Sequence, residues 1–321
     1  MSISIVCPTV NPSSAEVTVT ASISTLKVMF PPPVSLEEVR CLFQQLLASN
    51  HDDPNSHAHP VFISLDISHG NPKRFSAIGA STLDTRSLTT SHFSTPMHHT
   101  HPPLHTETFD FRYGRVGVNR NQLRALFHGQ VNQVRWSERA AVINHIFSHC
   151  VNGDREPCCN ARKLPLYDSS KVNDSNEQRL PIILVGHDIP SDLLSLNKAG
   201  ISINDVATVT AIIDTQKLAR EMYKADDPGW NVSLRTLCRL VGMIPTKLHD
   251  CGNDAAWTLL VLFSLAAKLI SEDDEGREIL EEVVREGTRD SKTRKQRDKG
   301  SRVRNKEDQG DWADNLVVEV P

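Results

Sequence analysis

The sequence predicts an α/β fold in which a mixed sheet is flanked by helices, with disordered N- and C-terminal tails. The first observation is the alternation of apolar runs, typical of buried strands, with segments of helical apolar spacing, which is clearest between residues 180 and 270. The second is a change of composition at both ends, from Ser, Thr and Pro at the start to dense charge at the finish. A chain of 321 residues is long enough for one such domain with tails.

Residues 1–35 are expected to form a disordered leader, because they are rich in Ser, Thr, Val and Pro and end in three consecutive prolines. The domain is predicted to span residues 36–270. Its first helix follows Ser35, a capping residue that has Glu38 three positions later. The apolar stripe of this helix consists of Val39, Leu42, Leu46 and Leu47.

The next part of the domain is predicted to begin with a strand and its hairpin partner, Val61 to Ile67 and Arg74 to Thr85. One further strand is expected near Thr106 to Phe111, within a His-rich and Pro-containing excursion. Residues 136–149 have a helical pattern. Residues 150–179 have no apolar period and many polar residues, which predicts a surface insertion.

The second half has the most regular pattern. Leu180 to His187 and Thr210 to Thr215 are predicted strands, and a helix begins near Ile189, with Pro190 in its first turn. Ser233 is expected to cap another helix that stops at Gly242.

The last predicted element of the domain is a buried core helix from about Asn253 to Ile270. It is too short for the roughly 20 apolar residues that a bilayer requires, and it contains Lys268. Residues 271–321 are predicted to form a charged helix that frays into a largely disordered tail. The basic residues of this tail are consistent with a nuclear-localisation signal or with non-specific phosphate binding. An ordinary solvated tail is an equally good interpretation.

Charge and cysteine content exclude several classes of protein. With 35 Lys and Arg against 39 Asp and Glu, any nucleic-acid binding must be local. The seven cysteines are odd in number and include no CxxC pair, which argues against a disulfide framework or a zinc knuckle and favours a reducing compartment, cytoplasmic or nuclear. The His98, His99, His101 and His105 cluster lacks a Cys partner, so zinc is not favoured there. No membrane partner is expected.

Three acidic residues stand where strands end or helices begin, at Asp66, Asp192 and Asp254. Side chains from such positions can converge on one crevice of an α/β sheet. Converging carboxylates favour a cation, and Mg²⁺ or Mn²⁺, as one or two ions, suits these ligands and could activate water against a phosphodiester. His249 adds a proton acceptor. Asp214 is interpreted as a structural acid, and Asp188 and Asp250 as helix caps.

The spacing from His249 to Asp254 limits their geometry. Five residues correspond to about 140° on a continuous helix, so the two side chains face one site only if His249 lies before the helix or at its mouth. Gly252 and Asn253 are expected to supply the break and the cap that this requires.

These segments resemble the three motifs of the DEDDh 3′-to-5′ exonuclease family, which has a ribonuclease-H-like fold. They are Asp66-Ile67-Ser68, Gly186-His187 through Asp192, and His249 through Asp254. The segments IIDTQKLAR and SLRTLCRLVGM also resemble the family, and the resemblance covers roughly residues 60–270. The hairpin AIGASTLDTRSL is similar to that of a fungal ribonuclease-H-like subgroup named for a link to mRNA export.

The resemblance implies that Asp66, Asp192 and Asp254 bind the metal, that His249 is the general base, and that the partner is a single-stranded nucleic-acid 3′ end, RNA or DNA. It also implies a Glu where this chain has Ser68. Removing a unit charge about 4 Å from a cation forfeits on the order of 4 kcal/mol at an effective dielectric near 20. Cys251 in place of the usual Ala is a milder change.

Two hypotheses therefore follow. One is a metal-dependent 3′-to-5′ exonuclease whose phosphodiester hydrolysis is impaired by Ser68. The other is a non-catalytic nucleic-acid-binding or scaffold protein in RNA metabolism.

Overall fold

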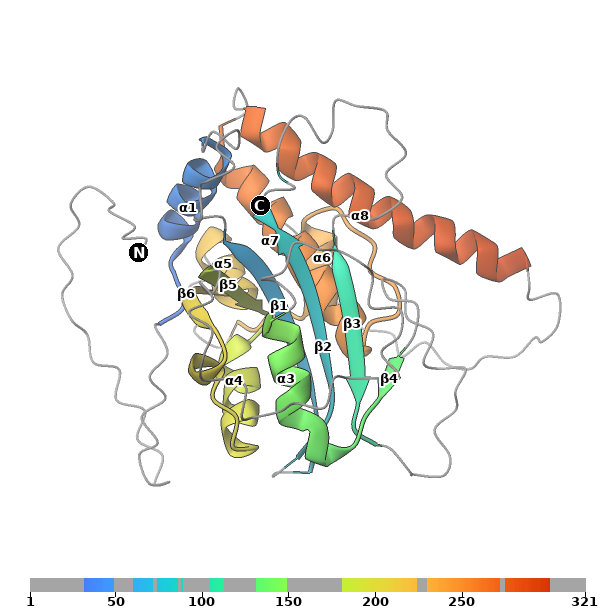
Figure 1. The fold of residues 1–321 in the computed structure, drawn as a ribbon. Coiled ribbons are helices and arrows are strands. Elements are labelled where there is room, and N and C mark those ends of the chain that lie inside the picture. The colour runs from blue at the N-terminus through green and yellow to red at the C-terminus, as the bar shows by residue number, and fades with distance from the viewer. Residues whose placement is uncertain are drawn as a thin grey trace.

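The protein is built around one six-stranded mixed sheet in the order β4-β3-β2-β1-β5-β6 (Figure 1). The computed structural model describes residues 32–48, 60–71, 74–85, 88, 104–112, 131–148, 181–223, 230–271 and 275–300. The strands are β1 (Val61–Asn71), β2 (Arg74–Asp84), β3 (His105–Asp110), β4 (Val131–Gln133), β5 (Pro181–Gly186) and β6 (Thr208–Asp214).

Strand direction changes within the sheet. β1 is antiparallel to β2, and β2 to β3. β3 with β4, β1 with β5 and β5 with β6 are parallel pairs. This arrangement confirms the predicted α/β class and is consistent with the ribonuclease-H-like fold. The short strand β4 was not predicted from the sequence.

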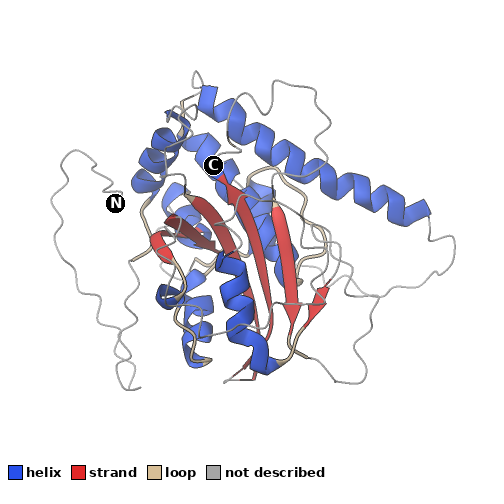
Figure 2. Cartoon of the chain, in the orientation of Figure 1, coloured by secondary structure: helices blue, strands red, loops and turns tan. Residues whose placement is uncertain are grey.

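Helices cover both faces of the sheet (Figure 2). One face, with Phe62, Ile183 and Val185, packs against the largest group of helices. The other face, with Leu65 and Leu184, packs against two helices. The first group is α1 (Leu36–Ala48), α5 (Thr215–Met222), α6 (Leu234–Leu240), α7 (Cys251–Leu269) and α8 (Glu275–Gly300); the second is α3 (Arg139–Ser148) and α4 (Ile189–Lys198).

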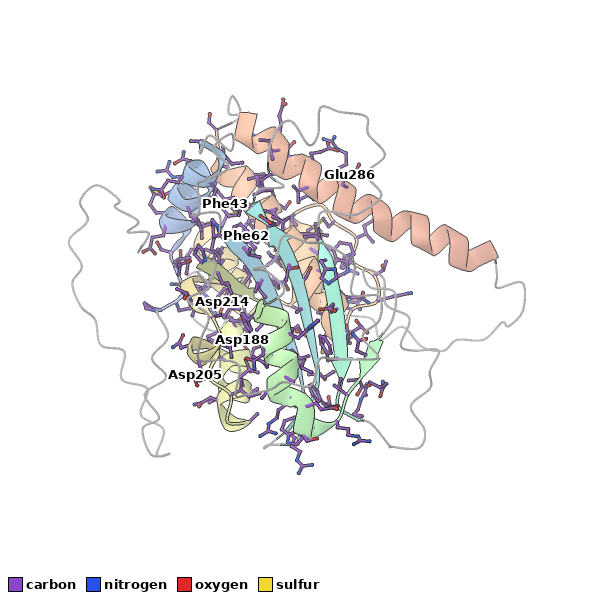
Figure 3. The ribbon with its side chains drawn as sticks, in the orientation of Figure 1. Phe43, Phe62, Asp188, Asp205, Asp214 and Glu286 are labelled. Atoms are coloured by element: carbon purple, nitrogen blue, oxygen red, sulfur yellow. The ribbon has the colours of Figure 1, made fainter. Side chains whose placement is uncertain are left out.

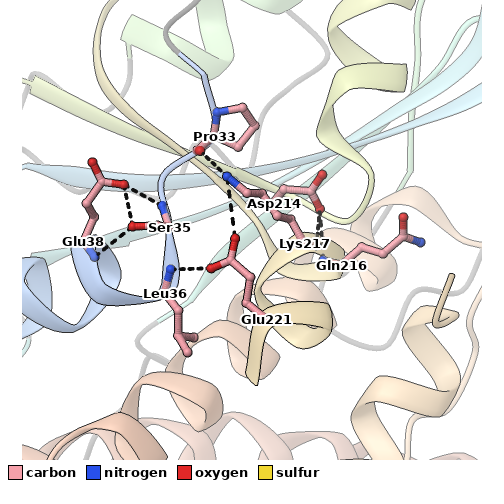
Figure 4. Close-up of polar contacts among 8 residues, drawn as sticks. All are labelled: Pro33, Ser35, Leu36, Glu38, Asp214, Gln216, Lys217 and Glu221. Carbon is pink, nitrogen blue, oxygen red and sulfur yellow. Dashed lines mark hydrogen bonds and ion pairs between the residues drawn. The ribbon is translucent and has the colours of Figure 1, made fainter. Parts of the chain in front are cut away.

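The predicted cap of α1 is confirmed. The Ser35 hydroxyl and backbone N–H both donate to the Glu38 carboxylate, at 2.7 and 2.6 Å, and the Glu38 N–H donates to Ser35 Oγ at 3.3 Å. The residues around this cap are hydrogen-bonded to α5, as Figure 4 shows, and to the neighbouring strand β6. Lys217 of α5 donates to the Pro33 carbonyl at 2.7 Å, and Val34 N–H donates to the Ile212 carbonyl of β6 at 2.9 Å.

The predicted buried core helix is also confirmed, because α7 is buried on nearly all sides. The charged segment after it begins as the predicted helix, α8. Ile279, Leu280 and Val283 of α8 are buried against the core, so packing extends beyond residue 270. Among the described helices, none is long and apolar enough to cross a membrane.

Several predictions concern residues outside the described part of the chain. These are the leader up to residue 31, the insertion at 150–179, the tail beyond residue 300, and His98, His99 and His101. The fourth member of that His cluster, His105, is exposed on β3, with Nε2 3.8 Å from a Glu107 carboxylate oxygen.

Candidate active site

Asp66 lies on β1, on the sheet face that α7 covers. Strand β5 pairs only with residues 61–64 of β1, so the section that carries Asp66 runs past the end of β5. Asp192, in the first turn of α4, lies against this section. Its Oδ1 atom accepts the Ile67 backbone N–H at 3.1 Å, and the Asp192 side chain is buried. The contact places the second predicted carboxylate beside the first.

A close approach of two backbones brings the third carboxylate to the same place. Gly79 of β2 pairs with Asp66 of β1. A Cβ atom on Gly79 would lie 2.0 Å from the carbonyl carbon of Cys251 and 2.3 Å from the nitrogen of Gly252. The first turn of α7, which carries Asp254, therefore rests on β2 directly beside Asp66. Our sequence analysis did not single out Gly79; a glycine inside a strand was the available signal, because it often marks close backbone approach.

Cys251 is in direct contact with the first motif. Its buried thiol donates a hydrogen bond to the Asp66 carboxylate. Burial raises the thiol pKa, and the negative charge of Asp66 raises it further, so the sulfur stays protonated near neutrality. The exchange of Ala for Cys in the third motif thus changes the environment of a proposed metal ligand.

The turn before α7 fixes the position of His249. Both Asp254 carboxylate oxygens accept the His249 backbone N–H, at 3.0 and 3.2 Å. His249 has a φ of 71° and Lys247 one of 54°, conformations that are uncommon for residues other than glycine. Asn253 Nδ2 donates to the Lys247 carbonyl at 3.0 Å and holds the turn against the helix. Strained turns of this kind are concentrated at functional sites.

This geometry confirms that His249 lies before the helix, but the expected break and cap are wrong. Helix α7 begins at Cys251 and continues through Gly252. The cap is Asp250, whose carboxylate accepts the Asn253 backbone N–H at 3.1 Å. An Asp side chain three residues ahead of a helical N–H is a better cap than Asn253 inside the first turn.

The carboxylates influence one another strongly. Burial raises the pKa of Asp254 to about 8, and the charge of Asp66 contributes to the shift. Burial also raises the pKa of Asp192 well above its usual value, again with a contribution from Asp66. The backbone hydrogen bonds from Ile67 and His249 oppose these shifts without cancelling them. Asp66 is thus electrostatically close to both other predicted ligands, one on α4 and one on α7.

This constellation agrees with a comparison of sequences. Residues 61–265 match the family described as DNA polymerase III subunit epsilon-like, C-terminal domain. The chain belongs to the DEDDh exonuclease family. The match spans the sheet from β1 onward and all three motifs. Among curated proteins, none matches the chain.

DEDDh proteins generally use divalent metal ions, and their family implies a nucleic-acid substrate. Within the described residues, no three His, Cys, Asp or Glu side chains stand close enough together to hold a metal as they are. The donor set still fits such an ion in chemistry. Three carboxylates offer hard oxygen ligands, and burial together with the charge of Asp66 raises the pKa values of Asp192 and Asp254.

Ser68 occupies the DEDDh position where a Glu is expected. It lies two residues after Asp66 on the same sheet face, next to an irregularity in the pairing of β1 with β2. The Ser76 hydroxyl lies 3.2 Å from Ser68 Oγ and 3.3 Å from the Ser68 carbonyl. A pair of neutral hydroxyls therefore stands where a fourth carboxylate would be.

Other polar residues near the DEDDh motifs are structural. Asp214 caps α5, accepting from Gln216 N–H at 2.9 Å, and also accepts Asp188 N–H at 3.1 Å, as predicted for a structural acid (Figure 3). Asp188 is at the cap position of α4 with a φ of 64°, but its side chain makes no capping hydrogen bond. Asp188 therefore occupies the predicted N-cap position without a side-chain capping hydrogen bond, whereas Asp250 caps α7 through its carboxylate.

His187 of the second motif is held on both sides. Its Nε2 atom lies 2.8 Å from the Val232 carbonyl and Nδ1 lies 3.0 Å from the Thr215 hydroxyl. Burial lowers its pKa, which favours the neutral ring. We therefore assign His187 to positioning of the chain between β5 and α5.

Proposed function

We propose that this DEDDh protein binds the 3′ end of a single-stranded nucleic acid at a site where Asp66, Asp192 and Asp254 hold one divalent ion, Mg²⁺ or Mn²⁺. The supporting observation is the electrostatic coupling of Asp66 to carboxylates from two other elements. Phosphodiester hydrolysis is the reaction, and it is slow because Ser68 supplies no charge to a second ion.

In this proposal the residues divide the chemistry among them. A bound divalent ion supplies Lewis acidity toward the phosphodiester and its attacking water. The His249 imidazole accepts the proton of that water, and its position before α7 is maintained by the contact between its own N–H and Asp254. Asp192 holds the start of α4 against the edge of β1 by accepting the Ile67 backbone N–H.

A second candidate function, nucleic-acid binding without turnover, is favoured by one observation. The Ser68 and Ser76 hydroxyls contact each other at the expected carboxylate position, which is an arrangement that is satisfied without a metal. In either case we propose a role in RNA metabolism in the cytoplasm or nucleus, because the hairpin resembles that of a fungal subgroup named for a link to mRNA export.

The test follows digestion of labelled single-stranded RNA and DNA with Mg²⁺ or Mn²⁺ by the wild type, Ser68→Glu and Asp254→Asn. Asp205→Asn, an exposed acid outside the three motifs, is the matched control. We expect slow digestion by the wild type, at least tenfold faster digestion by Ser68→Glu, and none by Asp254→Asn.

Each outcome separates the candidates. Digestion only by Ser68→Glu shows that the natural chain lacks turnover and favours the second candidate. No digestion by any variant, together with no thermal shift on adding metal, excludes a metal-dependent nuclease.

A further inference from the structure

A row of paired residues crosses the sheet beside the candidate site. In this row, Ser68 of β1 pairs with Ala77 of β2, which pairs with Asp110 of β3. Residues paired in register point to the same face, so Asp110 shares the α7 side of the sheet with the first motif. Two strand spacings separate them, roughly 10 Å. The end of β3 therefore borders the carboxylate site.

An arginine is held at this border by a buried acid. Arg112 Nε donates to Asp110 Oδ1 at 2.9 Å, and Nη2 donates to Oδ2 at 2.8 Å. The Asp110 side chain is 1% exposed, whereas the Arg112 side chain is 41% exposed. Gln133 of β4 supports the same carboxylate at 3.4 Å. Asp110 is thus the internal anchor and the guanidinium faces outward.

The guanidinium retains donors for a ligand. The pairing with Asp110 uses Nε and Nη2, and no contact within the described part of the chain engages Nη1. Cys251, which hydrogen-bonds to Asp66, lies within electrostatic range of Arg112, which agrees with the nearness that strand register predicts. Because Asp110 is buried and Arg112 is partly exposed, the pair presents an oriented cation at the surface.

We propose that Arg112 binds a backbone phosphate of the nucleic-acid strand whose 3′ end occupies the carboxylate site. A guanidinium suits this task because its planar donors match phosphate oxygens, and the Asp110 anchor reduces the conformational entropy lost on binding. The phosphate is not the one being cleaved, because Arg112 lies two strands from Asp66. This inference rests on the proposed function.

The experiment measures binding of a short labelled single-stranded oligonucleotide across a series of salt concentrations, with Ca²⁺ replacing Mg²⁺ to suppress cleavage. It compares the wild type with Arg112→Gln, Arg112→Lys and the double variant Asp110→Asn, Arg112→Gln, which leaves no uncompensated buried charge. Arg277→Gln is the matched control. It removes another ion-paired arginine, from the start of α8, near the far end of the 19-residue helix α7.

We expect Arg112→Gln and the double variant to bind about tenfold more weakly, with the slope of log affinity against log salt reduced by about 0.7. Arg112→Lys should keep the slope and lose part of the affinity, since it retains charge without the planar donors. A nucleoside monophosphate has no second phosphate for Arg112 to bind, so it should compete equally well in all variants. A variant with a structural defect at the site would also bind the nucleoside monophosphate more weakly.

Wild-type affinity and slope in the double variant would overturn the inference while leaving the proposed function intact. A wild type that binds no oligonucleotide would instead refute the proposed function, and this inference with it.

Discussion

Asp66, Asp192 and Asp254 are drawn from a strand and two helices into a place where carboxylates repel one another. Burial and mutual repulsion raise the pKa of Asp254 to about 8 and that of Asp192 well above its usual value. Without a cation the site therefore retains protons at neutral pH. A divalent ion would displace them, so metal binding and pH are linked.

The first prediction concerns that linkage. An acid with a raised folded-state pKa stabilises the fold at pH below its unfolded value, near 3.8 for Asp, and loses this contribution as pH rises toward about 8. We expect the metal-free protein to lose stability between pH 5.5 and 8, by at most about 1.4 kcal/mol per pH unit for each such proton. Added Mg²⁺ should restore more stability at pH 8 than at pH 6.

The measurement is the melting temperature with and without Mg²⁺ at each pH. Asp254→Asn should flatten the metal-free profile, because its amide does not titrate. A profile in wild type as flat as that of Asp254→Asn would contradict the assigned shift.

The second prediction concerns Cys251, whose thiol occupies one hydrogen-bonding position of Asp66. Cys251→Ala frees that position and should tighten Mg²⁺ binding about fivefold, the equivalent of one hydrogen bond near 1 kcal/mol. Cys41→Ala is the control, a thiol on α1 outside the three motifs, and should leave metal affinity unchanged. Titration calorimetry checks both, and equal affinities in the two variants would argue against a role for the thiol.

At the scale of elements, the contact between β2 and α7 assembles the site. Gly79 allows the start of α7 to rest on the sheet at the position paired with Asp66. Because the atoms facing Gly79 belong to the backbone of Cys251 and Gly252, a side chain there cannot be accommodated by a rotamer change.

The third prediction follows from this contact. Gly79→Ala should displace the first turn of α7, destabilise the fold by roughly 1–3 kcal/mol and abolish the thermal shift produced by Mg²⁺. Gly287→Ala on α8 is the matched control. Its added methyl would meet the Leu260 side chain of α7 at 2.5 Å, away from the first turn of that helix, and a side chain can move where a backbone cannot. That variant should keep its thermal shift with Mg²⁺. A normal thermal shift in Gly79→Ala would show that this contact is not needed for metal binding.

Elements with strong local signals were predictable from the sequence. The apolar run of β5, the capped start of α1 and the buried pattern of α7 each have a dominant local cause. Strand β4 has three residues, too few for any periodicity to show. The start of α7 was misplaced because both Asp250 and Asn253 are good capping residues, and only the turn geometry decides between them.

The candidate site was predictable in part. The positions of the acids and the resemblance to DEDDh motifs point to Asp66, Asp192 and Asp254 from the sequence alone. The roles of Gly79, Asp110 and Arg112 depend on strand register, which joins residues far apart in the sequence. Local patterns predict the β1–β2 hairpin, but they do not give the exact register between strands far apart in the sequence.

At the scale of the whole molecule, α8 is part of the packed domain although its composition is that of a charged tail. Leu280 and Val283 are fully buried, and Gly287 lies against Leu260 of α7. Because α7 also supplies Asp254, the packing of α8 stabilises the helix on which the site depends.

The fourth prediction tests this packing. Leu280→Ala should lower the free energy of unfolding by about 2–5 kcal/mol, as expected for truncating a buried leucine. Glu278→Ala, an exposed neighbour on the same helix, should change it by less than about 0.5 kcal/mol. Urea denaturation of both variants decides, and a stable Leu280→Ala would mean that α8 is not part of the cooperative fold.

The central claim is that carboxylates from β1, α4 and α7 bind one divalent ion. Anomalous diffraction from crystals soaked in Mn²⁺ tests it most directly. We predict a single peak bordered by Asp66, Asp192 and Asp254, absent from Asp254→Asn crystals. A peak at another place, or no peak in wild-type crystals at saturating Mn²⁺, would contradict the claim.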